Sequence, residues 1–104
     1  ITDGEGFVHN LKDHGIDIKG KKITVAGGGG AATAIQVQCA LDGAREISIF
    51  NIKDAFFERT LKTAEKIRAA VPSCVVNVYD IADTARMTAE IASSDIFANA
   101  TIVA

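Results

Sequence analysis

Residues 23–30 read Ile-Thr-Val-Ala-Gly-Gly-Gly-Gly, so an apolar, β-branched run passes directly into four consecutive glycines. A short run of this kind is typical of a parallel strand that helices cover on both faces. Residues 31–41 are mainly small and apolar, and Gly43 is well suited to end a helix. The sequence therefore predicts a strand, a glycine turn and a buried helix in succession.

The same alternation of strand and helix continues along the chain. We expect strands at 46–50, 74–79 and 95–98, helices at 54–70 and 83–92, and a leading helix at 6–14 ahead of a core that begins at Lys22. Asp54 is a candidate N-cap for its helix. Because short connections in such an alternation require right-handed parallel crossovers, we predict a three-layer α/β domain. Its class is the doubly wound Rossmann type, with a four-stranded parallel sheet in the order 3-2-1-4.

Length and charge exclude several classes of protein. A chain of 104 residues is long enough for one domain and too short for two. Its 11 basic and 13 acidic residues form no basic stripe, which argues against a nucleic-acid partner. No apolar run approaches the roughly 18 residues that cross a bilayer, so we expect no membrane partner and a soluble, cytoplasmic chain.

Two further features concern cysteines and the start of the chain. Cys39 and Cys74 lie in apolar surroundings without metal-ligand spacing, so we predict buried thiols in a reducing cytoplasm and no metal site. The chain begins at Ile1 without an initiator Met or a signal-like segment, and we interpret it as a segment of a longer protein.

The glycine turn fits the dinucleotide-binding pattern G-x-G-x-x-[GA], with Gly27, Gly29 and Ala32 at its fixed positions. The first glycine permits a tight turn, the second lets a pyrophosphate approach the backbone, and the small third residue lets the helix pack on the strand. The helix N-terminus would offer free N–H groups to phosphates. We predict cofactor contacts from Gly27, Gly28, Gly29, Gly30, Ala31 and Ala32. A turn that is glycine-rich for packing alone is the alternative.

The end of the second strand is where such sites distinguish a ribose hydroxyl from a 2′-phosphate, about 20 residues after the glycine turn. Asn51 can hydrogen-bond a ribose hydroxyl, Lys53 favours a phosphate, and Asp54 accepts from hydroxyls and repels a phosphate. The alternative is that Asp54 only caps its helix and that Lys53 only faces solvent. Tyr79 and Asp80, at the end of the third strand, are candidates to border an adenine.

Several motifs together resemble the shikimate dehydrogenase family. They are Thr2-Asp3-Gly4 with Gly6-Phe7, Ile18-Lys19-Gly20-Lys21-Lys22 before the glycine turn, Phe50-Asn51, Ser94-Asp95-Ile96 and Asn99-Ala100-Thr101. Their order and spacing match the family over the whole chain. Residues 50–57 and 81–83 most resemble the quinate/shikimate dehydrogenase branch.

The resemblance implies the NAD(P)-binding domain of an oxidoreductase. The full-length protein would interconvert 3-dehydroshikimate and shikimate, or 3-dehydroquinate and quinate, by hydride transfer. By the same resemblance, Asn99 and Thr101 contact the cofactor, Thr2 and Asp3 bind substrate hydroxyls, and Asp3 acts in proton transfer with a Lys of a substrate domain that is absent from this chain. We therefore expect the isolated chain to be inactive, with a homodimer as one option for its assembly.

The sequence also departs from the family pattern. Ile1 stands where the family has Asn, and Ile52 replaces an Arg that in many members pairs with the NADP 2′-phosphate. We therefore expect NAD as the cofactor, with NADP possible. Ile102 and Ala104 depart from the family's motif at the nicotinamide side. Two alternatives remain: a non-catalytic nucleotide-binding or sensing Rossmann domain, and an S-adenosylmethionine methyltransferase core.

Overall fold

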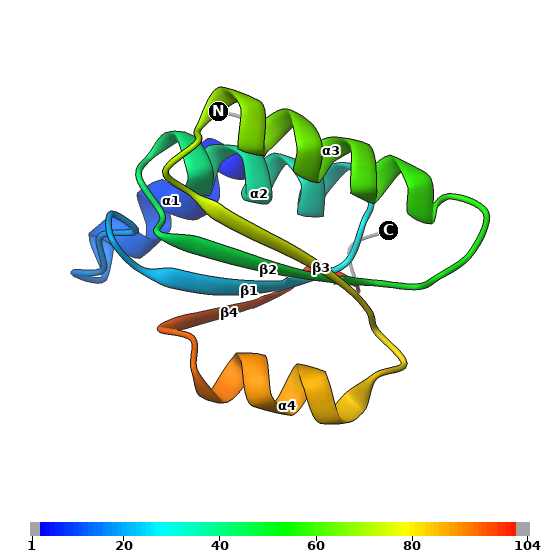
Figure 1. The fold of residues 1–104 in the computed structure, drawn as a ribbon. Helices are drawn as coiled ribbons and strands as arrows, with labels where there is room; N and C mark the ends of the chain where they lie inside the picture. Colours follow the sequence, from blue (N-terminus) through cyan, green and yellow to red (C-terminus); the bar gives the residue numbers. More distant parts are fainter. Residues whose placement is uncertain (1–2, 102–104) are drawn as a thin grey trace.

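The computed structural model describes residues 3–101, except for the side chain of Asp3. Strands and helices alternate throughout (Figure 1). In chain order the elements are α1 (Asp3–Asp13), β1 (Lys22–Ala26), α2 (Gly30–Leu41), β2 (Glu46–Asn51), α3 (Phe57–Ala70), β3 (Val75–Asp80), α4 (Thr84–Ala92) and β4 (Ile96–Asn99).

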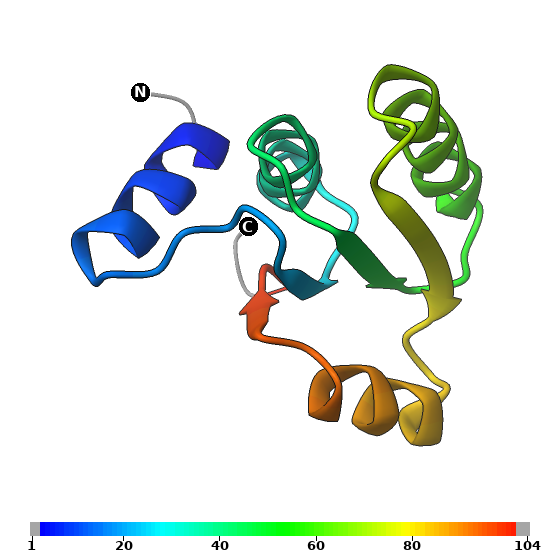
Figure 2. The same cartoon turned by 60° about the vertical axis from the view of Figure 1, so that its left-hand side comes forward.

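The four strands form one parallel sheet in the order β3-β2-β1-β4, as predicted. Helices α1, α2 and α3 lie on one face, and α4 lies on the other (Figure 1). Figure 2 shows α1 beside α2, with α3 on the far side of α2. Ala26 is in register with both Phe50 and Asn99, and Asn51 is in register with Asp80. The carboxyl ends of all four strands therefore meet at one edge of the sheet.

The face of the sheet toward α2 and α3 carries the apolar core. Ile23, Val25, Ile47 and Ile49 have no solvent exposure and share one hydrophobic cluster with residues of α2 and α3, including Ala32, Cys39, Ala64 and Ile67. This packing fixes the directions of both helices relative to the sheet. It therefore fixes where the glycine turn before α2 lies.

The face toward α4 carries buried polar side chains, which the sequence analysis did not anticipate. Ser48 is fully buried and its Oγ donates a hydrogen bond to Glu90 Oε1 over 2.7 Å. Lys22 Nζ lies 3.1 Å from the same oxygen and 2.6 Å from Ser93 Oγ. Among residues 3–101, no buried side-chain nitrogen or oxygen lacks a hydrogen-bond partner. A buried hydrogen-bond network thus contributes to the attachment of helix α4 to the sheet.

Two predicted helix starts were wrong. Helix α3 begins at Phe57, and Asp54 does not cap it, because Asp54 Oδ1 instead accepts a hydrogen bond from the backbone N–H of Phe56 over 2.9 Å. Helix α1 begins at Asp3, earlier than residue 6. Its Gly4 lies against α2, where an added Cβ would be 2.9 Å from Gln38 Cβ. This close approach explains a glycine inside a helix.

Candidate functional site

Gly27 lies at a point where three segments meet. Its φ is +125°, and its N–H donates a 2.7 Å hydrogen bond to the carbonyl of Phe50. An added Cβ would lie 3.1 Å from the carbonyl oxygen of Ala100 and 3.3 Å from Ala32 Cβ. The turn after β1, the segment after β4 and the first turn of α2 therefore pack closely around Gly27, and the positive φ makes a side chain at this position strained.

The side chain of Gln36, in α2, forms a hydrogen bond to this turn. It is 1% exposed, and its Nε2 donates to the carbonyl oxygen of Gly27 over 3.3 Å. Sequence reasoning missed this role, although a glutamine among the small apolar residues of a buried helix is a signal for a specific internal hydrogen bond.

Gly29 and Gly30 stand in open space. Gly29 is the N-cap of α2 with φ −76° and ψ −174°, a conformation open to any residue. An added Cβ at either glycine would meet no atom within 4 Å. No side chain caps α2, and its first turn carries no acidic residue. The first N–H groups of the helix thus have no intrahelical partner, and its own first turn supplies no carboxylate to the positive end of its dipole.

Asn51 joins the end of β2 to the glycine turn and to α3. Its Nδ2 donates to Thr60 Oγ1 over 3.0 Å, and its Oδ1 accepts from the N–H of Ile52 over 2.8 Å. An added Cβ at Gly28 would overlap the Asn51 amide. Because a primary amide has two N–H groups and two lone pairs, one of each remains for a ligand.

A groove of about 400 Å³ opens at this edge of the sheet. Its lining residues come from four loops: Gly27, Gly28, Gly29, Asn51, Ile52, Ile81, Ala100 and Thr101. It lies where the strand order reverses between β1 and β4, the position at which doubly wound sheets bind ligands. Ile52 and Ile81 give it two apolar residues that sequence reasoning did not assign to the site. Tyr79 does not line it and instead stacks on Phe50, with ring centroids 5.0 Å apart.

The remaining predicted site residues differ in position. Thr101 lines the groove, and its N–H and Oγ1 both donate to Asn99 Oδ1, over 3.1 and 2.5 Å. Lys53 and Asp54 are exposed and do not line the groove. Thr2 lies outside the described residues, and so does the side chain of Asp3.

The described residues contain neither a metal-ligand cluster nor a helix suited to cross a membrane. Within residues 3–101, no group of three or more His, Cys, Asp and Glu side chains is arranged to hold a metal ion. No helix in that range combines the length and hydropathy that a membrane crossing needs.

Comparison with known proteins gives close relatives. The chain is 54% identical over 101 residues to the shikimate dehydrogenase (NADP(+)) of Listeria monocytogenes serotype 4b (strain F2365), a match that covers 97% of this chain and 34% of that protein. The chain therefore spans about a third of the length of the curated relatives that it matches. No protein-family model matches the chain.

Solved structures give the same result. The crystal structure of shikimate 5-dehydrogenase from Listeria monocytogenes in complex with shikimate and NAD matches with a TM-score of 0.91 and 53% identity, over 97% of this chain and 35% of that one. Quinate dehydrogenase from Corynebacterium glutamicum in complex with NAD matches with a TM-score of 0.74 and 23% identity, over 96% of this chain and 33% of that one. At that identity the second likeness shows the fold alone.

Proposed function

We propose that this chain, a homologue of the shikimate dehydrogenases over about a third of their length, binds a nicotinamide dinucleotide. The protein that carries it would interconvert 3-dehydroshikimate and shikimate, or 3-dehydroquinate and quinate. A bound nicotinamide supplies hydride transfer, and this chain supplies binding and orientation.

The observation that carries the proposal is the open space at Gly29 and Gly30. At Gly27 a positive φ and tight contacts with Ala100 and Ala32 disfavour a side chain, and at Gly28 the Asn51 amide occupies its space. No atom of the described chain occupies the corresponding space at Gly29 or Gly30, and Gly29 has an ordinary φ. A packing turn therefore does not explain these two residues. A pyrophosphate that approaches the backbone at the start of α2 explains both.

The other residues of the groove fit the rest of a dinucleotide. We assign the pyrophosphate to the N–H groups at Gly28–Ala32, with Gly27 and Ala32 shaping the turn. Asn51 has donor and acceptor capacity for ribose hydroxyls, and Ile52 and Ile81 offer apolar surface to an adenine. Ala100 and Thr101 lie on the side of β4, and we assign them, with Asn99, to the nicotinamide half.

The substrate side of the proposal rests on the resemblance. Thr2 and Asp3 would bind substrate hydroxyls, and the Asp3 carboxylate would accept a hydrogen bond from the reacting alcohol and assist a lysine of the substrate domain in proton transfer. Helix α1, which begins at Asp3, packs beside α2 through Gly4, so this end of α1 is attached to the helix that begins at the glycine turn. A homodimer in the cytoplasm remains part of the proposal.

The test uses the intact protein that carries this chain. Steady-state rates with shikimate and with quinate, each with NAD and with NADP, identify the substrate and cofactor. Asp3→Asn should lower kcat by about 100-fold or more, the usual contribution of general acid–base groups, while the Kd for the dinucleotide stays unchanged. Turnover of neither substrate, with the dinucleotide still bound, would favour the alternative of a non-catalytic sensing domain.

A further inference from the structure

Thr60 is the polar residue on the side of α3 that faces the core. Thr60, Ala64 and Ile67 are 4%, 0% and 4% exposed, and their spacing of four and then three residues places them on one side of the helix. Ala64 and Ile67 belong to the hydrophobic cluster. A valine would have nearly the same shape at residue 60 and would bury no hydroxyl. Because a buried polar group costs free energy unless it is hydrogen-bonded, the hydroxyl of Thr60 needs a reason beyond packing.

The Thr60 hydroxyl accepts a hydrogen bond from the side chain of Asn51. Asn51 Nδ2 donates to Thr60 Oγ1 over 3.0 Å, and Asn51 Oδ1 accepts from the backbone N–H of Ile52 over 2.8 Å. A backbone N–H can only donate, so Ile52 determines which end of the amide carries the oxygen. Thr60 supplies the contact at the opposite end. The two contacts together fix the plane of the Asn51 amide.

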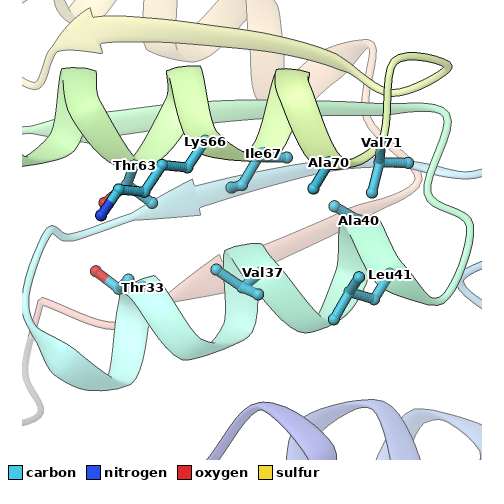
Figure 3. Close-up of a pocket in the computed structure, with 9 residues that line it drawn as sticks. All are labelled: Thr33, Val37, Ala40, Leu41, Thr63, Lys66, Ile67, Ala70 and Val71. Atoms are coloured by element: carbon cyan, nitrogen blue, oxygen red, sulfur yellow. The ribbon is translucent and has the colours of Figure 1, made fainter.

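Helix α3 is itself packed against α2. Figure 3 shows Val37 and Ala40 of α2 and Ile67 and Ala70 of α3 pointing toward one another across the groove between the two helices. Thr60 lies two turns before Ile67 on the same buried side of α3. The packing that fixes the position of α3 therefore also fixes the position of the Thr60 hydroxyl.

Helix α3 also runs beside the glycine turn. Lys62 and Lys66 line a groove of about 580 Å³ together with Gly28. Asn51 and Gly28 line the groove of about 400 Å³ that we assign to the dinucleotide. Thr60 lines neither groove. Any influence of Thr60 on a ligand in the first groove must therefore pass through a residue that Thr60 contacts, and that residue is Asn51.

A fixed amide has a consequence for the ligand. Asn51 retains one N–H and one lone pair that are not used within the chain, and the two contacts present both groups to the groove in one orientation. Two hydroxyls on neighbouring carbons of a ribose can each donate and accept, so they suit such an amide. An amide that is already oriented loses less conformational freedom when the ligand binds, which increases the affinity.

We propose that Thr60 is a positioning residue for the dinucleotide, which holds the Asn51 amide in the orientation that binds ribose hydroxyls and does not touch the ligand itself. This inference rests on the proposed function, because the ribose belongs to the dinucleotide assigned to the first groove. Thr60→Val preserves the shape of the buried side chain and leaves the Asn51 amide with the contact to Ile52 alone.

The experiment is calorimetric titration of the intact protein with NAD, with urea unfolding to show that each variant is folded. We expect Thr60→Val to weaken NAD binding about threefold to tenfold, the contribution of one hydrogen bond. Thr60→Ala also lacks the hydroxyl and should act in the same direction. Thr60→Ser keeps the hydroxyl and should bind NAD within about twofold of the unmodified protein. Thr60→Val added to Asn51→Ala should cause no further loss of affinity, because Thr60 acts through Asn51.

The matched control is Thr88→Val, the same chemical change at an exposed residue of α4 whose Oγ1 donates to the Thr84 carbonyl oxygen over 2.9 Å. It should leave NAD binding unchanged. Equal NAD affinity in Thr60→Val and the control would overturn the inference and leave the proposed function standing.

Two further results would also overturn the inference. A loss in Thr60→Ser as large as that in Thr60→Val would assign the effect to packing and not to the hydroxyl. Equal losses from Thr60→Val with and without Asn51→Ala would show that the effect does not pass through Asn51. Failure of the unmodified protein to bind NAD would reject the proposed function and this inference together.

Discussion

The side-chain amide of Asn51 occupies the space that a β-carbon on Gly28 would need, with Asn51 Cγ only 2.5 Å from that position. Thr60 on α3 accepts from the same amide over 3.0 Å and is itself 4% exposed. The end of β2, the glycine turn and α3 are therefore fitted together through one amide. A change at Gly28 must displace Asn51 or move the turn.

The first prediction concerns Gly28→Ala. The added methyl group should destabilise the protein by about 1–3 kcal/mol, the usual cost of overpacking, and should weaken dinucleotide binding because Asn51 and the turn move apart. Urea unfolding and calorimetric titration measure the two effects. Asn51→Ala removes the colliding atoms. Gly28→Ala should therefore cost much less stability when it is added to the Asn51→Ala variant than when it is added to the unmodified protein. Strictly additive losses would show that the two residues do not interfere.

The second prediction concerns Gln36→Leu. This change removes the donor to the Gly27 carbonyl oxygen and leaves that buried acceptor without this partner, which costs about 1–3 kcal/mol. Gln38→Leu in the same helix is the comparison variant: Gln38 is half-buried and its Nε2 donates to Asp42 Oδ2 over 3.2 Å, so this change should cost about 1 kcal/mol or less. Equal unfolding midpoints for the two variants would show that the hydrogen bond from Gln36 to Gly27 does not stabilise the turn.

The third prediction concerns the stability of α4 at low pH. The hydrogen bond from Ser48, together with Lys22 and Arg86, holds the pKa of the Glu90 carboxyl below its ordinary value, although burial acts in the opposite direction. A carboxyl whose pKa is lower in the folded state stabilises the fold above its unfolded pKa and loses that contribution as the pH falls through the folded pKa. Stability should therefore fall with acidification below the ordinary carboxyl value of 4.5.

Glu90→Gln tests whether Glu90 causes this loss of stability at low pH. It should cost about 3 kcal/mol at pH 7, the low end for a broken buried pair, because Glu46 remains 3.6 Å from Lys22. Part of the acid dependence of the unfolding free energy should disappear in the variant. An unchanged slope between pH 3 and pH 5, where unpaired carboxyls ordinarily titrate at about 4, would place the acid sensitivity in another group.

The fourth prediction concerns the two thiols. Burial, and then the nearby Asp42 and Cys74, raise the pKa of Cys39 to about 12. Burial and the neighbouring Glu46 also raise the pKa of Cys74. Since the thiolate is the nucleophile, neither cysteine should react appreciably with a thiol reagent at pH 8 in the folded protein. Both should react fully in concentrated urea, and rapid labelling of the native protein would contradict the buried environment.

Much of the fold could be predicted because the sequence places strong local signals in order. The apolar run at 23–26 ends in glycines, and the next two strands are each followed by a turn and a helix. The topology follows from the handedness of crossovers, a rule that needs no side-chain detail. The start of α3 was missed because the Asp54 side chain can accept from a turn as well as from a helix, and the sequence does not distinguish the two.

The candidate site was predictable only where its residues belong to a local motif. Gly27 and Ala32 follow from the glycine pattern, but the contact of Gly27 with Ala100 depends on the pairing of β4 beside β1. The place of Lys62 and Lys66 beside the glycine turn could not be predicted, because the helical periodicity of α3 does not show which element lies next to it. The polar layer around Glu90 was missed because its members are far apart in sequence.

The most direct test of the dinucleotide site is Gly29→Val. No atom lies within 4 Å of the new β-carbon, so the unfolding free energy should fall by less than about 1 kcal/mol, the scale of a changed N-cap. The side chain would occupy the space assigned to the pyrophosphate. Calorimetric titration of the intact protein with NAD and NADP should therefore show binding to the unmodified protein and at least a roughly tenfold weaker affinity, about 1.4 kcal/mol, in the variant. Equal affinity in a folded Gly29→Val protein would contradict the account, because the glycine turn would then not contact the pyrophosphate.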